Sequence, residues 1–174
     1  MSLVTSNLNV AKGLYVSVTP SMHDRKNLSS VLGFIAKHTR YVVDTDYLHT
    51  TVIYSTTPIK KIKDAEKTVK TLIRSKSTLY RAKTTQFTYW RGHNNQLVLI
   101  LELDSDDLAY LHYQLKNMGF ETTFPDYKAH ITLADDIKDL SESQLKDLVQ
   151  ELNTKVLPHL THLILYKPLI ENAN

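Results

Sequence analysis

Two short motifs carry the residues best suited to chemistry: His49-Thr50-Thr51 and His130-Ile131-Thr132. They lie 81 residues apart (130 minus 49) and share the order histidine, any residue, threonine. Histidine takes up or gives away a proton near neutrality because its ordinary pKa is about 6.5. A threonine hydroxyl can donate a hydrogen bond to a developing oxyanion. Two such pairs together supply a base, an acid and two donors, which suits phosphodiester cleavage and requires no metal.

The residues around each motif predict a strand that points these groups to one side. Leu48 to Tyr54 and Ala129 to Ala134 are rich in β-branched and apolar residues. Residues i and i+2 of a strand share a face, so each histidine is expected beside its threonine. If the two strands run side by side about a pseudo-two-fold axis, the four groups converge on one phosphate.

Two other readings of the motifs compete with this one. A single His-x-Thr is commonly a half-buried histidine beside a β-forming threonine, but repetition in corresponding elements favours a functional pair. A zinc site needs a third protein ligand with characteristic spacing, and the sequence contains no His-x-x-x-His. We therefore expect no metal site and no cofactor.

The composition fits one folded unit. The 174 residues are 42% hydrophobic and 22% charged, and residues 1–12 are expected to form a flexible or peripheral tail. The absence of cysteine excludes disulfides, thiolate metal sites and a cysteine nucleophile. A net charge of +3 is too small for coating long nucleic acid but suits a small anion. With no apolar run of membrane length and no export signal, the expected compartment is the cytoplasm; the oligomeric state stays open.

The remaining patterns alternate hairpins with helices. Helices are predicted for Asp24 to Lys37, Lys63 to Arg74, Ser105 to Gly119 and Ser141 to Leu152. Strands are predicted for Gly13 to Val18, Thr78 to Trp90, Gln96 to Leu103 and Leu160 to Tyr166. This order indicates an α+β protein with two related halves, each containing one histidine strand.

The two tripeptides resemble the paired His-x-Thr signature of the two-histidine (2H) phosphoesterases. Within that superfamily, three stretches are similar to the phage enzymes of the anti-CBASS protein 1 family: Gly13 to Val16, Leu48 to Ser55 and Pro125 to Leu133. The resemblance extends from about Gly13 to Leu169.

The resemblance implies a bilobal fold: two pseudo-symmetric antiparallel sheets with outer helices and a central cleft. It implies metal-independent hydrolysis of the 3',5' linkages of bacterial cyclic di- and trinucleotide immune signals, in the host cytoplasm if a phage encodes the chain. A ribose 2'-hydroxyl would attack, giving a 2',3'-cyclic phosphate that is then opened. His49 and His130 would be base and acid, in an order left open, and Thr51 and Thr132 would hold the phosphate.

Three further residues are candidates for substrate binding. Tyr15 matches the family's first-strand tyrosine, which stacks on a nucleobase. Trp90 is either the other side of a base clamp or an ordinary hydrophobic residue at a strand end. Lys128 shares a predicted face with His130 and is either a phosphate ligand or a solvated lysine. Lys167 stands before Pro168-Leu169 where the family often has glutamate, which leaves the base preference open.

Two competing functions remain. One is RNA end processing by a 2',3'-cyclic phosphodiesterase or 2',5' RNA ligase, and the other is a degenerate 2H protein that sequesters a nucleotide without cutting it. The intact four motif residues argue against sequestration, and the low net charge argues against long RNA. The other histidines are expected to have surface or packing roles, and His112 to reach a sheet edge from a helix flank.

Overall fold

The computed structural model describes residues 13–55, 65–74, 79–122, 124 and 126–173. The expected tail, 1–12, lies outside the described residues. The strands are β1 (Gly13–Pro20), β2 (Thr50–Ser55), β3 (Leu79–Arg91), β4 (Leu97–Asp104), β5 (His130–Ile137) and β6 (His162–Ala173). The helices are α1 (Met22–Ile35), α2 (Ala65–Arg74), α3 (Asp106–Asn117) and α4 (Glu142–Lys155), with short 3₁₀ turns at Thr45–Tyr47 and Leu157–His159.

All six strands belong to one antiparallel sheet with the order β2-β1-β6-β3-β4-β5. The α+β class is confirmed, but the prediction of two separate sheets is wrong. β3 pairs with β6 from Leu79↔Tyr166 to Lys83↔His162, which joins a β2-β1-β6 half to a β3-β4-β5 half. The predicted pseudo-symmetry therefore concerns two halves of one sheet.

The join depends on β6, which is longer than the predicted strand Leu160 to Tyr166. It continues to Ala173 and pairs with β1 beyond the point where it leaves β3. Pro168 lacks a backbone N–H, and the register shifts beside it, between Ser17↔Leu169 and Thr19↔Tyr166. An irregularity of this kind accommodates a proline within a strand, so Pro168 does not end β6.

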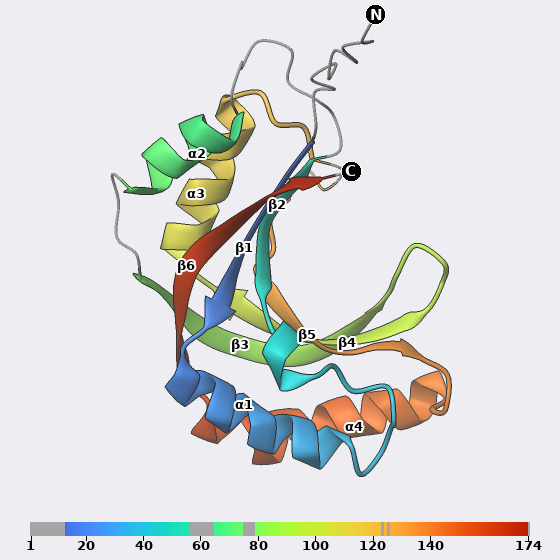
Figure 1. Cartoon of the computed structure of the whole chain (residues 1–174). Helices are drawn as coiled ribbons and strands as arrows, with labels where there is room; N and C mark the ends of the chain where they lie inside the picture. Colours follow the sequence, from blue (N-terminus) through green and yellow to red (C-terminus); the bar gives the residue numbers. More distant parts are fainter. Residues whose placement is uncertain (1–12, 56–64, 75–78, 123, 125, 174) are drawn as a thin grey trace, which may run out of the picture.

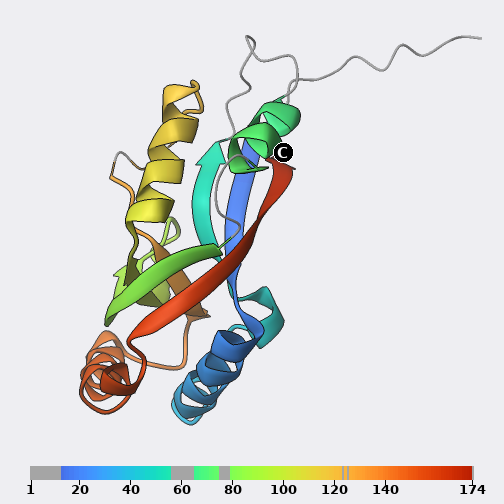
Figure 2. The same cartoon turned by 90° about the vertical axis from the view of Figure 1, so that its left-hand side faces the viewer.

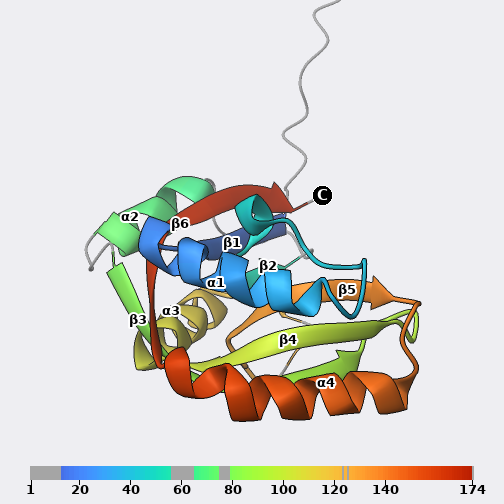
Figure 3. The ribbon, with the colours of Figure 1, turned by 90° about the horizontal axis from the view of Figure 1, so that it is seen from below.

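The helices are divided between the two ends of the molecule. α2 and α3 lie beside the β2-β1-β6 half, and α1 and α4 lie at the opposite end (Figure 1). The turned view separates α2 from α3 and α1 from α4 (Figure 2), and the view from below shows α4 running along β3 and β4 (Figure 3). None of the described helices is long and apolar enough to cross a membrane.

The four predicted helices are confirmed, although the predicted start of α2 at Lys63 lies outside the described residues, and the end signals predicted for α3 and α4 are confirmed as well. The Ser105 side chain accepts a hydrogen bond from the Leu108 backbone at the start of α3. Gly119, just after α3, has a φ of 101°, a conformation that glycine adopts without a steric penalty. Ser141 and Gln144 form the predicted capping box of α4.

Candidate active site

The two His-x-Thr motifs show the same pattern of burial. His49 and Thr51 are half-buried, as are His130 and Thr132. The residues that alternate with them are fully buried: Leu48, Thr50, Val52, Ala129, Ile131 and Leu133. β2 begins at Thr50, so His49 lies one residue before the strand and not within it as predicted. The alternation nevertheless extends through both motifs, and each histidine shares a side with its threonine.

The two imidazoles are held by the same local hydrogen bond. His49 Nδ1 lies 2.7 Å from the Tyr47 carbonyl oxygen, and His130 Nδ1 lies 2.8 Å from the Lys128 carbonyl oxygen. A carbonyl can only accept, so Nδ1 carries the proton and donates in both rings. This leaves Nε2 of each ring as the atom that can exchange a proton with a substrate.

His49 and His130 lie close enough to influence each other electrostatically. Burial is the main cause that lowers the pKa of His130. The hydrogen bond to Lys128 opposes this effect, the nearby His49 lowers the pKa further, and Glu102 raises it. Since two neighbouring imidazolium ions repel, the pair favours states with no more than one added proton.

Each histidine also has an aromatic neighbour that meets it edge-on. The Tyr15 ring lies 6.2 Å from the His49 ring at 79°, and its hydroxyl is 3.5 Å from Thr51 Oγ1. The Trp90 ring lies 4.6 Å from the His130 ring at 78° and is 36% exposed. The structure thus brings both predicted base-stacking residues to the histidine pair, one in each half.

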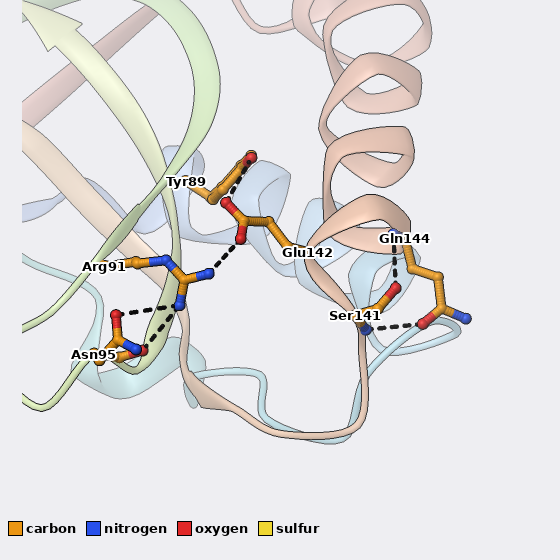
Figure 4. Close-up of polar contacts among 6 residues, drawn as sticks. All are labelled: Tyr89, Arg91, Asn95, Ser141, Glu142 and Gln144. Carbon is orange, nitrogen blue, oxygen red and sulfur yellow. Dashed lines mark hydrogen bonds and ion pairs between the residues drawn. The ribbon is translucent and has the colours of Figure 1, made fainter.

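The β-hairpin that carries Trp90 is attached to the start of α4 (Figure 4). The predicted β3–β4 pair is confirmed. Next to Trp90, Arg91 forms an ion pair with Glu142, and Tyr89 donates a hydrogen bond of 3.3 Å to the same carboxylate. Arg91 also donates to the carbonyl and the side-chain oxygens of Asn95 in the turn. These contacts orient the hairpin relative to α4.

Two polar residues on β4 and β3, the first of them opposite His130, were not predicted. Glu102 is the direct cross-strand partner of His130, and its carboxylate accepts a hydrogen bond of 2.6 Å from Gln86 Nε2. No motif marks them in the sequence, because their role depends on β-strand register. The side chain of Lys128 is exposed, and phosphate binding by it stays a prediction. What the structure assigns to Lys128 is the carbonyl that orients His130.

His112 was predicted to have a surface or packing role and to reach a sheet edge from the helix flank; it reaches the edge strand β2 as a packing residue that is only 2% exposed. Its Nδ1 donates a hydrogen bond of 2.7 Å to the Val52 carbonyl, and its ring stacks on Tyr127 at 4.5 Å. In the described part of the chain, no group of three or more histidine, aspartate or glutamate side chains is arranged to hold a metal ion.

This architecture is similar to those of several solved proteins. It superimposes on Usb1 of Kluyveromyces marxianus with a TM-score of 0.60 over 95% of this chain and 96% of that chain, at 9% sequence identity. It superimposes on E. coli LigT complexed with 3'-AMP with a TM-score of 0.51 over 75% of this chain and 76% of that chain, at 16% identity. At these identities the likeness shows a shared fold alone, and the class that this fold defines is an α+β protein.

The sequence also matches the family described as anti-CBASS protein Acb1 over residues 12–158. The chain therefore belongs to the Acb1 family of anti-CBASS counter-defence proteins. This confirms the family resemblance inferred from the two motifs and the stretches around them.

Proposed function

We propose that the chain hydrolyses the 3',5' linkages of cyclic di- and trinucleotide immune signals without a metal ion. The observation that carries the proposal is the matched pair of imidazoles, each with Nδ1 bound to a carbonyl and Nε2 left for chemistry. Membership of the anti-CBASS family supports cyclic nucleotide signals as the substrate class.

In the first step, one imidazole removes the proton of a ribose 2'-hydroxyl as its oxygen attacks the adjacent phosphorus. The bond from phosphorus to the 5' oxygen breaks, and the second imidazole, protonated at the outset, donates its proton to that oxygen. The lowered pKa of His130 favours its neutral form, so we assign the base to His130 and the acid to His49. The products are a 2',3'-cyclic phosphate and a 5'-hydroxyl.

In the second step the roles are exchanged. After the first step His49 is neutral and His130 is protonated, so His49 can take a proton from water while His130 protonates the departing ribose oxygen. Thr51 and Thr132 donate to the non-bridging phosphate oxygens in both steps. Tyr15 and Trp90 stack on the bases, and Lys128 binds a phosphate oxygen.

The test is to incubate the purified protein, with and without EDTA, with cyclic di- and trinucleotides, linear RNA and 2',3'-cyclic AMP. We expect cleavage of the cyclic oligonucleotides at an unchanged rate in EDTA, with a bell-shaped dependence of kcat/KM on pH. His49→Ala and His130→Ala should each abolish cleavage. The matched control is His23→Ala, since His23 is exposed on α1.

Other outcomes separate the competing functions. Reaction of linear RNA ends alone would establish end processing instead. Tight binding of cyclic oligonucleotides without any product would establish sequestration. Full activity in either active-site histidine variant would remove that histidine from the mechanism.

A further inference from the structure

The strand that follows His49 contains a β-bulge next to the catalytic motif. Val16 pairs with Ile53 and the next residue, Ser17, pairs with Thr51, so Val52 is an extra residue in β2. β2 is also the edge strand of the sheet. At a bulge on an edge strand, backbone carbonyls lose their regular partners and need other donors.

Two side chains supply these donors. Tyr127 donates its hydroxyl to the Thr51 carbonyl at 3.2 Å, and His112 Nδ1 donates to the Val52 carbonyl at 2.7 Å. The two rings are stacked, with 4.5 Å between centroids and 16° between planes. Burial raises the pKa of the Tyr127 phenol and lowers that of His112, so both stay neutral donors at ordinary pH.

Tyr127 also links the two halves of the site. It stands three residues before His130 and directly before Lys128, whose carbonyl orients the His130 ring. Its hydroxyl reaches the backbone of Thr51 in the other motif. One side chain therefore connects the segment that orients His130 with the strand that carries Thr51.

We propose that Tyr127 and His112 are positioning residues that hold the β2 bulge and thereby set the separation of the two His-x-Thr motifs. The catalytic part of this inference rests on the proposed phosphodiesterase function. Reacting groups need near-attack geometry, so a shift of about 1 Å in one motif relative to the other costs on the order of 100-fold in rate.

The competing explanation is that the stacked pair only fills space behind β2. Tyr127→Phe separates the two explanations because it keeps the ring and removes only the hydroxyl. His112→Leu removes the donor to Val52, whereas His112→Asn places an amide nitrogen near the position of Nδ1. The matched control is Tyr41→Phe, which removes the surface hydroxyl that meets Arg40.

We expect Tyr127→Phe and His112→Leu to lower kcat about 10-fold or more with KM unchanged, measured well below each variant's Tm. His112→Asn should recover most of the loss, and Tyr41→Phe should match the wild type. Because both residues act on the same bulge, the double variant should lose less than the product of the single losses.

A second measurement needs no substrate: an NMR titration of the His49 and His130 rings in wild type and Tyr127→Phe. If the two motifs move apart, the repulsion weakens and the pKa of His130 rises, while Glu102 stays opposite its ring. If Tyr127→Phe changes neither the titration of the two histidine rings nor kcat, the inference is overturned. If wild type cuts none of the substrates, the proposed function fails and the titration alone decides the positioning role.

Discussion

Replacing Trp90 by alanine should change two measurable properties of the site at once. Trp90 lies 4.6 Å from the His130 ring, with 36% of its surface exposed. The exposed part is available to a nucleobase, and the ring packs edge-on against the imidazole. Trp90→Ala removes both, whereas Trp90→Phe keeps a smaller ring in the same place.

The two magnitudes follow from these contacts. Stacking of a base on an aromatic ring contributes about 1 to 3 kcal/mol, so KM should rise about 5- to 160-fold in Trp90→Ala. Burial is the main cause that lowers the pKa of His130. Admitting water should therefore raise that pKa toward the ordinary value of about 6.5. In the proposed mechanism His130 starts as the neutral base, so the acid limb of the pH profile of kcat/KM should move to higher pH.

The assay is the initial rate of cyclic oligonucleotide cleavage against substrate concentration, repeated from about pH 5 to pH 9 to cover both limbs. Trp90→Phe should lie between wild type and alanine in both KM and the position of the acid limb. Phe124→Ala, which removes a 60% exposed ring beside His93, is the aromatic control and should resemble wild type. Wild-type KM and an unmoved acid limb in Trp90→Ala would show that Trp90 is only a packing residue.

Three further outcomes concern stability and are measurable by urea unfolding. The pKa values of His112 and His130 are lowered in the folded state, so the unfolded chain binds more protons below about pH 6.5, and the free energy of unfolding should decrease as the pH is lowered there. His112→Asn should make this pH dependence less steep, and an equal slope in that variant would contradict the prediction. Asn153→Ala should cost about 1 to 3 kcal/mol, because its side chain bonds both the N–H and the carbonyl of Phe87 at 2.8 Å; a cost near zero would mean that other groups replace these bonds. Glu142→Gln should lower the free energy of unfolding by less than about 1 kcal/mol, because its ion pair with Arg91 is exposed to solvent. A larger loss that persists in high salt would contradict the view that this is a weak surface ion pair.

Local signals in the sequence were sufficient for the elements and for the histidine motifs. Serine caps, apolar periodicity and turn residues are short-range properties, so all four helices and the β3–β4 hairpin were predicted near their observed places. The alternation of buried and half-buried residues around His49 and His130 follows from strand geometry, which a sequence pattern expresses directly.

Long-range pairing was the part that local signals did not contain. Lys167 and Pro168 break the apolar alternation, so the strand was predicted to end at Tyr166, and the single sheet depends on its continuation. The role of Tyr127 depends on a bulge in β2, which exists only once β1 and β2 are in register. The full burial of His112 was not foreseen, because burial of a helix-flank histidine is decided by what packs against it, here Tyr127 and the Val52 carbonyl.

The two halves of the site repeat a local arrangement in unequal surroundings. Each ring is fixed by the carbonyl two residues before it, yet His130 alone has a directly opposed glutamate in its β-ladder and a tryptophan against its ring. Under the proposed mechanism the equal anchoring lets either ring serve as base or acid, and the different neighbours of His130 decide which ring starts neutral. Removing both neighbours of His130 tests these influences. In Trp90→Ala combined with Glu102→Gln, loss of burial raises the pKa of His130 and loss of the carboxylate lowers it. The acid limb of the kcat/KM profile should therefore lie closer to wild type in the double variant than in Trp90→Ala. A limb displaced as far as in Trp90→Ala, or farther, would refute the view that burial and Glu102 shift the pKa of His130 in opposite directions.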